Sequence, residues 1–373
     1  MDQWIETKLE DVGEFKNGIN KPSEDFGFGV PFVNLMNVFG RSTISANIDL
    51  GLVNANTKEI DIYDLKKGDV LFIRSSVKKS GVGETSVVTE DMPRTVYSGF
   101  LIRFRDTKLS LDLNFKKYCF CVKSFRQNLL SLSSTSANTN INQDSLNSLS
   151  LLLPSNLEQE KIATFLTLID ERINTQSKII QELQTQIQSL REQILTKKLR
   201  FKDNQGNAFP DWEVKSLSDL LVIGSGKDYR HLGDGNFPVF GTGGLMTYVD
   251  SFLYDGETVC IGRKGTIDKP MYYKGKIWTV DTLFYTHSFF NCVPKFIFYT
   301  FQSINWLEYN EASGVPSLSK STIEKIKVNI PSFKEQELIA DFLSSIDSKI
   351  ETEKGILLQY ENQKKYLLKN LFI

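Results

Sequence analysis

Two stretches of the chain are near copies of each other, and this repeat constrains the fold more than any other feature. Residues 158–166 (EQEKIATFL) return as residues 335–343 (EQELIADFL), 177 positions later, and the register then holds without a gap. Trp4 returns as Trp212 at a different offset, 208 positions. The offsets differ by 31 residues (208 − 177), so the two copies differ in the length of their interiors. Duplication of a unit of one domain plus one helix explains both offsets and predicts internal pseudo-two-fold symmetry.

The repeated segments predict two long helices of the coiled-coil type. Apolar residues alternate four and three positions apart over residues 162–194 and again over residues 339–371. That spacing is typical of a coiled-coil seam. One seam position is polar in both copies, Gln176 in the first and Glu353 in the second. A polar seam residue can fix the register of the helices or can mark a partly solvated gap, and both interpretations stay open.

The repeat and its punctuation predict the order of domains. Pro154 and Pro331 each stand four residues before a Glu-Gln-Glu motif and mark where the preceding segment ends. We therefore expect an α+β fold, in which two mixed α/β domains are separated by two long antiparallel coiled-coil helices with an internal pseudo-two-fold repeat. The expected limits are 1–155 for the first domain, 156–199 for the first helix, 200–332 for the second domain and 333–373 for the second helix.

Patterns inside the two domains are mixed. Strand-like runs at 69–73 and 257–261 each precede a basic loop that contains glycine. An apolar stripe within 115–130 predicts one helix that also carries Cys119 and Cys121 as packing residues, and residues 297–304 repeat the stripe. The polar tract 133–142 predicts a loop, either disordered or facing a partner.

Composition excludes several classes of protein. No apolar run approaches the ~18 residues of a membrane span, and the N-terminus lacks the pattern of a signal peptide. The four cysteines show no CxxC spacing, which favours a reducing, cytoplasmic setting with inert thiols. Two histidines are too few for a histidine-rich metal site. The net charge of −1 neither demands nor excludes a nucleic-acid partner, because the charge that matters there is local.

Patterns that suggest enzymes fail on their spacing. Residues 224–228 (GSGKD) lack the first glycine and the final hydroxyl residue of a phosphate-binding loop, and residues 241–246 (GTGGLM) lack the last glycine of a dinucleotide fingerprint. In residues 211–215 (DWEVK) the two acids stand too close together to reach one metal from separate strands. We therefore expect no active site, no metal and no cofactor in this chain.

Basic loops are the stronger signal. Residues 66–79 hold five Lys or Arg against one Asp, and residues 262–276 do the same at the corresponding place of the second copy. Glycine lets a backbone approach a phosphate closely, and Arg or Lys binds phosphates and guanine edges. One charged loop is usually only solvated, but two at matching places favour DNA binding. The candidate DNA-binding residues are Arg74, Lys78, Lys79, Asn138, Asn140, Lys227, Arg230, Arg263, Lys264 and Lys320.

With these residues in view, the whole chain resembles the specificity subunits of type I restriction-modification systems. The strongest likeness is the pair of Glu-Gln-Glu-x-Ile-Ala motifs that begin the coiled-coil helices. Residues 200–212 (RFKDNQGNAFPDW) are similar to the family's usual lead into a target-recognition domain. Three internal loops add to the likeness: 262–266 (GRKGT), 281–285 (DTLFY) and 314–318 (GVPSL).

The resemblance implies a non-catalytic reader of double-stranded DNA. Each domain would recognise one half of a split site, and the helices would set the distance between the halves. It also implies two methyltransferase subunits, which carry S-adenosylmethionine, and restriction-translocase subunits. The starts of the helices would form their docking surface, with Glu158, Gln159, Ile162, Phe165, Glu335, Gln336, Ile339 and Phe342 as the contacting residues.

The domains differ in length, about 150 residues from Trp4 to Pro154 against about 119 from Trp212 to Pro331, which predicts an asymmetric site. Two other classes stay open. One is a coiled-coil adaptor whose two domains bind ligands other than DNA. The other is a self-contained DNA-modifying enzyme, which the missing catalytic motifs argue against.

Overall fold

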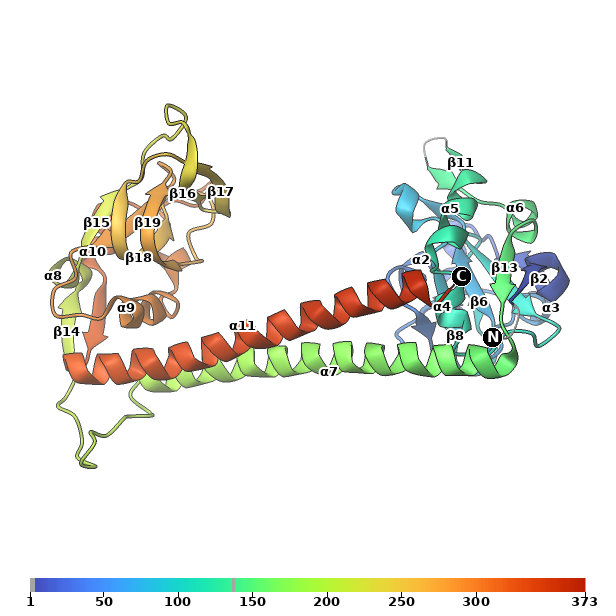
Figure 1. The fold of residues 1–373 in the computed structure, drawn as a ribbon, viewed down its shortest axis with the longest axis horizontal. Helices are drawn as coiled ribbons and strands as arrows, with labels where there is room; N and C mark the ends of the chain where they lie inside the picture. The colour runs from blue at the N-terminus through green and yellow to red at the C-terminus, as the bar shows by residue number, and fades with distance from the viewer. Residues whose placement is uncertain (1–3, 136–137, 373) are drawn as a thin grey trace. The chain divides into compact units, whose positions relative to one another are not determined.

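The computed structural model describes residues 4–135 and 138–372, and it divides into two compact units (Figure 1). Unit 1 combines Met1–Ser177 with Ile356–Ile373, and unit 2 is Lys178–Gly355. Each unit therefore contains one sheet-rich domain and a part of each long helix. The mixed α/β architecture with two sheet-rich domains confirms the predicted fold class. None of the described helices is both long and apolar enough to cross a membrane.

The domain of unit 1 is built on a five-stranded sheet of order β2-β10-β6-β8-β4 and a three-stranded sheet of order β5-β3-β9. A pair β1-β13 and a small sheet β11-β12-β7 complete it. The strands are β1 (Ile5–Lys8), β2 (Gly13–Asn17), β3 (Phe26–Val33), β4 (Thr43–Ile44), β5 (Gly51–Val53), β6 (Val70–Ile73), β7 (Ser75–Ser76), β8 (Thr85–Val88), β9 (Val96–Tyr97), β10 (Leu101–Asp106), β11 (Ser134–Thr135), β12 (Thr139–Asn140) and β13 (Ser150–Leu153). The helices are α1 (Leu9–Val12), α2 (Leu35–Val38), α3 (Thr57–Ile62), α4 (Lys116–Cys119), α5 (Lys123–Ser131) and α6 (Gln143–Asn147), with short 3-10 turns η1 (Ser23–Asp25) and η2 (Lys79–Gly81).

The domain of unit 2 has one six-stranded sheet of order β15-β20-β18-β19-β16-β17 and the pair β14-β21. The strands are β14 (Glu213–Ser216), β15 (Val222–Ser225), β16 (Asp234–Gly241), β17 (Gly244–Val249), β18 (Tyr254–Gly262), β19 (Met271–Thr279), β20 (Leu283–His287) and β21 (Lys327–Ile330). The helices are α8 (Leu217–Leu220), α9 (Pro294–Phe301) and α10 (Lys320–Lys325), with the 3-10 turn η3 (Trp306–Tyr309).

The two domains share one topology. The order β2-β10-β6 in the first matches β15-β20-β18 in the second. In both, a strand (β3 or β16) pairs antiparallel with one later strand (β5 or β17) and parallel with another (β9 or β19). The first domain is longer in part because residues 34–50, with α2 and β4, stand where the second has only Thr242 and Gly243 between its strands.

A repeated glycine has a steric reason. A Cβ on Gly18 would lie 2.1 Å from the carbonyl oxygen of Ser98, and one on Gly226 would lie 2.0 Å from that of Val280. Only glycine permits so close an approach of two backbones. The match of Gly18 with Gly226 in the sequence therefore marks the same strand crossing in both domains.

The single helix expected within 115–130 is wrong, because the structure breaks it into α4 and α5. Val122, between them, has an extended backbone with ψ 140°. Tyr118, Val122, Phe125 and Leu129 are nevertheless buried in one core. The predicted apolar face is therefore present, but two short helices form it instead of one continuous helix. Cys119 is buried as expected, but Cys121 is exposed and is not a packing residue.

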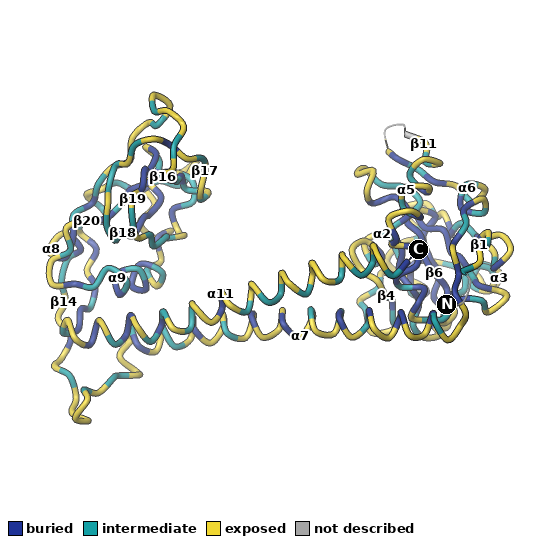
Figure 2. The backbone as a smooth tube through the Cα atoms, viewed as in Figure 1, coloured by how far each residue is buried: buried dark blue, intermediate teal, exposed yellow. Residues whose placement is uncertain are grey.

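The long helices are α7 (Asn156–Leu195) and α11 (Phe333–Asn370), and their seams behave as predicted. Along α7 every seam residue is buried or half-buried, and Figure 2 shows the buried positions recurring along it. Within unit 1 the two helices run antiparallel: Lys364 pairs with Asp170 at 2.6 Å, and two residues further along α7, Arg172 reaches back to Tyr360. The polar seam residue Gln176 is only 7% exposed, which argues against a solvated gap at that position.

Candidate nucleic-acid interface

Arg74 and Arg263 occupy equivalent places in the two domains. Each directly follows a buried strand, β6 or β18, and each is held by the same pair of backbone hydrogen bonds. In each domain the arginine N–H donates to the carbonyl oxygen of the residue just before the neighbouring strand. The arginine carbonyl oxygen accepts from the backbone N–H of a buried residue shortly before a short helix. The four bonds run from Arg74 N to Phe100 O (2.8 Å), Arg263 N to Thr282 O (2.7 Å), Ile141 N to Arg74 O (3.0 Å) and Leu318 N to Arg263 O (2.9 Å).

In the second domain the structure brings Arg263, Lys264 and Lys320 to one hollow of about 360 Å³. All three side chains are exposed. An isolated β-bridge between Lys264 and Ser317 joins the basic loop to the segment that leads into α10, where Lys320 is the first helical residue. Three cations around one concave surface suit a phosphate backbone, because each can replace a condensed counterion.

Glu311 organises this hollow from one side. Its carboxylate accepts hydrogen bonds from the backbone N–H of Ser319 (3.2 Å), the hydroxyl of Ser319 (2.7 Å) and the hydroxyl of Thr322. The Thr322 and Ser319 bonds lower the pKa of Glu311 below its ordinary value of 4.5. Ser319 also caps α10, since its side chain accepts from Thr322 N. The loop before Lys320 is thus fixed by a carboxylate that stays ionised at neutral pH.

Lys227 and Arg230 lie beside the same cluster. The backbone of Lys227 is fixed by a bond from its N–H to Thr279 O (2.8 Å), and its side chain is exposed. Arg230 is exposed, pairs with Asp228 at 3.0 Å and lines a second hollow that includes residues 281–282. The N–H of Arg263 donates to the carbonyl oxygen of Thr282, so a backbone hydrogen bond joins the loops that line the two hollows. All five basic candidates of this domain therefore lie around neighbouring loops.

In the first domain the structure places Asn140 beside the basic loop, through strand pairing that the sequence did not predict. Strand β12 pairs with β7, which directly follows Arg74, and Asn140 lies opposite Ser75. Lys78 and Lys79 follow β7 and are exposed, as is Asn138. The prediction of a loop over residues 133–142 is therefore wrong where the chain forms β11 and β12. Residues 136–137 lie outside the described residues.

Part of each predicted basic cluster lies elsewhere. Lys66 and Lys67 precede β6 and therefore lie at the opposite end of that strand from Arg74, which directly follows it. In the second domain, Lys274 is within β19 and pairs with Glu257 at 3.2 Å. A sequence window cannot separate the two ends of a strand, so these lysines are not part of the candidate interface.

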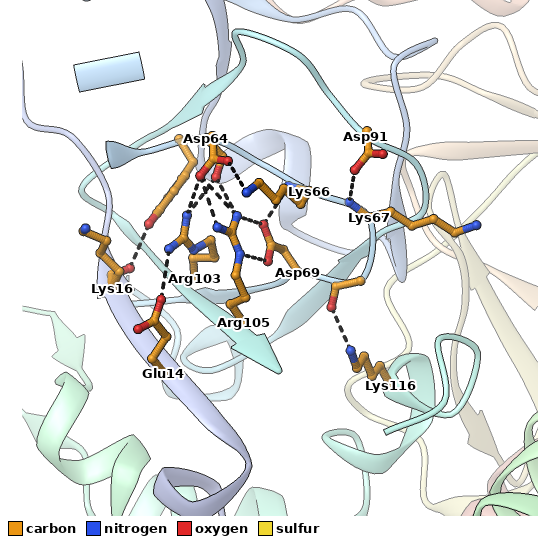
Figure 3. Close-up of polar contacts among 12 residues, drawn as sticks. Glu14, Lys16, Asp64, Lys66, Lys67, Asp69, Asp91, Arg103, Arg105 and Lys116 are labelled. Carbon is orange, nitrogen blue, oxygen red and sulfur yellow. Dashed lines mark hydrogen bonds and ion pairs between the residues drawn. The ribbon is translucent and has the colours of Figure 1, made fainter. Parts of the chain in front are cut away.

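Figure 3 shows what occupies that opposite end: a network of charges in which Arg103 and Arg105 of β10 meet Asp64 and Asp69, which precede β6. Arg105 makes a two-fold hydrogen bond to Asp69, with both distances 2.7 Å, and Asp69 is 1% exposed. Burial opposes the charge of Arg105, but its bonds to Asp69 and Asp64 outweigh burial and raise its pKa. Arg103, 2% exposed, also donates to Asp64. We interpret this network as structural, because its arginines pair with carboxylates of the same domain.

The glutamines of the two Glu-Gln-Glu motifs join each helix to its own domain. Gln159 is 1% exposed and Gln336 is 0% exposed. Each side chain donates to the proline that precedes its helix and to one neighbouring loop, and accepts from a backbone N–H of that loop. The Gln159 side chain donates to Pro154 O (3.2 Å) and Ser110 O (3.0 Å) and accepts from Asp112 N (2.9 Å). The Gln336 side chain donates to Pro331 O (2.9 Å) and Asn291 O (3.3 Å) and accepts from Val293 N (2.8 Å).

A second repeated contact was missed in the sequence. The hydroxyl of Tyr118 donates to Asp170 (2.9 Å), and that of Tyr299 donates to Asp347 (2.6 Å). Burial raises the pKa of both tyrosines, so both remain protonated donors. The sequence did offer one signal for this contact: Asp170 matches Asp347, and both stand next to a seam residue. A repeated aspartate at that position indicates a hydrogen-bond partner outside the coiled-coil seam.

The structure places the residues of the predicted docking surface at different depths. Gln159, Ile162, Glu335, Gln336 and Ile339 are buried inside their own unit, because they fix the helix to the domain. The partner contacts predicted for these five residues stay predictions. Glu158 and Phe342 are half-buried, and Phe165 is 44% exposed. Within this chain, the Glu-Gln-Glu motif therefore mainly attaches each long helix to its own domain.

Comparison with known proteins decides the family. The model of the type I restriction modification DNA specificity domain matches residues 1–185 and 210–362. The chain belongs to the type I restriction-modification DNA specificity family. Among curated relatives, the putative MjaX specificity subunit of Methanocaldococcus jannaschii is 26% identical over 98% of this chain and 92% of its own. The EcoprrI specificity subunit of Escherichia coli is 23% identical over 40% of this chain and 38% of its own.

Solved structures give the same fold for this family member. The S subunit of a type I system from M. genitalium superposes with a TM-score of 0.62 at 18% identity, covering 100% of this chain and 96% of that one. A chain from a study of complex assembly in a type I system gives 0.61 at 14% identity, covering 98% and 96%. Among residues 4–135 and 138–372, no group of three or more His, Cys, Asp or Glu side chains is placed to hold a metal ion.

Proposed function

We propose that this specificity-family chain reads an asymmetric bipartite DNA site, one half with each domain, and does no chemistry itself. The observation that carries the proposal is the matched placement of Arg74 and Arg263, which follow equivalent strands and make the same backbone bonds. In each domain further polar or basic candidates gather beside that arginine. Two similar but non-identical basic surfaces are what recognition of two unlike half-sites requires.

The long helices supply the spacing in this proposal. Helix α7 has 40 residues, or roughly 60 Å at 1.5 Å per residue. Half-sites read from one face of B-DNA lie about 34–36 Å apart for each helical turn between them. A helix of this length is therefore long enough to span two such half-sites.

The remaining parts of the proposal concern the complex. Two methyltransferase subunits would supply S-adenosylmethionine and methylate the target adenine, and restriction-translocase subunits would join them in the cytoplasm. Names of the relatives and of the solved type I complex support a multisubunit assembly. The coiled-coil adaptor without a DNA role has no support from the family.

Replacement of Arg263 and Lys264 by Ala tests the assignment. In the complex with its methyltransferase, the double variant should weaken recognition of one half-site by about 1–3 kcal/mol per lost base contact and leave the other half-site unchanged. The measurement is methylation of oligonucleotides with either half-site permuted. Lys274→Ala is the matched control, because Lys274 lies in the same basic run but within β19. An unchanged preference at both half-sites would remove this loop from the interface.

A further inference from the structure

The first domain presents an exposed aromatic residue beside Arg74 that is not among the candidates from the sequence. Phe100 is the residue just before β10, and its carbonyl oxygen accepts the N–H of Arg74 (2.8 Å). Its side chain is 60% exposed. The guanidinium of Arg74 also bonds to this turn, because Arg74 Nη1 donates to Gly99 O (3.4 Å). The arginine head group and the residue that carries the exposed ring are therefore neighbours in space.

The turn that carries the ring, residues 98–100, is held firmly by the domain. Three successive N–H groups are bonded: Gly99 N to Ile19 O (2.8 Å), Phe100 N to the hydroxyl of Ser98 (3.2 Å) and Leu101 N to Ser98 O (2.8 Å). A ring on a fixed turn has little conformational freedom left to lose when a partner covers it. Phe100 is thus well placed to make a specific contact outside the domain.

The second domain keeps the same frame and changes the side chain. Arg263 Nη1 donates to Asp281 O (3.5 Å), and the N–H of Arg263 donates to Thr282 O (2.7 Å). These two bonds match those of Arg74, so Thr282 is the counterpart of Phe100. An equally held arginine stands beside a large apolar ring in one domain and beside a short hydroxyl side chain in the other. Two readers of different bases would differ in this way, because base edges are distinguished by the chemistry that faces them.

We propose that Phe100 is a specificity-determining residue of the first domain, and that its ring contacts the C5 methyl group of a thymine. The inference rests on the proposed function, since that function brings DNA to Arg74. Among the bases, thymine alone carries an apolar group in the major groove, and phenylalanine is one of the side chains that contact it. Arg74 binds the adjacent phosphate or guanine edge and so orients the ring.

The charge around the ring favours DNA over an apolar protein surface as its partner. Lys78 and Lys79 are exposed on the segment that begins with Arg74. An apolar protein surface laid on Phe100 would desolvate these cations without compensation. In DNA the base edges are flanked by phosphates, which would pair with the same cations.

Deoxyuridine, which is thymidine without the C5 methyl group, tests the inference in the complex of the full-length chain with its methyltransferase. Each thymine of the two half-sites is replaced in turn, and methylation kcat/KM is measured. At one position kcat/KM should fall about fourfold, the effect of removing one methyl group from an apolar contact. The Phe100→Ser complex should methylate the thymine and deoxyuridine DNAs of that position equally well.

Leu109→Ala is the matched control. Leu109 is an apolar residue of the same domain, 83% exposed, and it lies beyond the opposite end of β10 from Phe100. The Leu109→Ala complex should keep the full sensitivity to deoxyuridine.

Two results would overturn the inference. One is a sensitivity to deoxyuridine that Phe100→Ser leaves unchanged, or the absence of any sensitive thymine, since the ring would then contact no methyl group. The other is loss of a protein partner in Phe100→Ser with the base preference intact, which would assign the ring to a protein surface. Failure of the proposed function would appear differently, as a complex of the unaltered chain that methylates DNA without sequence preference.

Discussion

At the scale of single residues, a carboxylate holds together a loop of the candidate interface. Glu311 is the clearest case, because it fixes the loop between Asn310 and α10 through Ser319 and Thr322. Because the pKa of Glu311 is lowered in the folded protein, its ionised form is the one that accepts the hydrogen bonds of the loop. The stabilisation of the loop by ionised Glu311 is therefore complete above pH 4.5, the ordinary pKa of this side chain. It is lost as the pH falls through the lower pKa that Glu311 has in the folded protein.

Glu311→Gln should therefore loosen the loop at neutral pH. We expect faster amide hydrogen exchange in residues 311–322 and weaker discrimination by the second domain of about fivefold, the loss expected for one or two net hydrogen bonds. In the unaltered chain, exchange protection of the loop should fall below pH 4.5. Protection that is the same in both proteins and insensitive to pH would show that Glu311 does not hold the loop.

At the scale of elements, the sequence was informative where periodicity or repetition carried the signal. The seams of α7 and α11 follow from their 4-3 spacing, and the repeated Gly18 and Gly226 mark one strand crossing. Strands β11 and β12 could not be foreseen, because β12 pairs with Ser75 and Ser76, far away in the sequence, and β11 pairs with β12. The burial of Gln159 was likewise hidden, since its partners are backbone groups of a distant loop.

The spacing role of the helices predicts the effect of an insertion. Four residues, about one turn, inserted after Gln176 in α7 and after Glu353 in α11 should change the number of base pairs between the half-sites and leave both half-sites unaltered. The measurement is the methylated motif of the variant complex. As a control, four residues inserted in the exposed turn 204–207 should leave the gap unaltered. A constant gap in the helix variant would refute the spacing role.

At the scale of the whole molecule, the chain is a duplication whose copies have diverged unequally. Both domains keep the strand order, the buried glutamine and the tyrosine–aspartate contact. Only the first has the segment 34–50 with α2 and β4 and the buried arginine network of β10. The basic loops also differ, Arg-Ser-Ser in one and Arg-Lys-Gly in the other. Shared scaffolds with different loops should read different bases.

The most direct test is a map of methyladenine across the genome of a host cell with and without this chain, in the presence of its methyltransferase. We predict that one split motif, with two unlike halves and a fixed gap, is methylated only when the chain is present. A map that does not change, or a methylated motif that is continuous or palindromic, would contradict the reading of two different half-sites by the two domains.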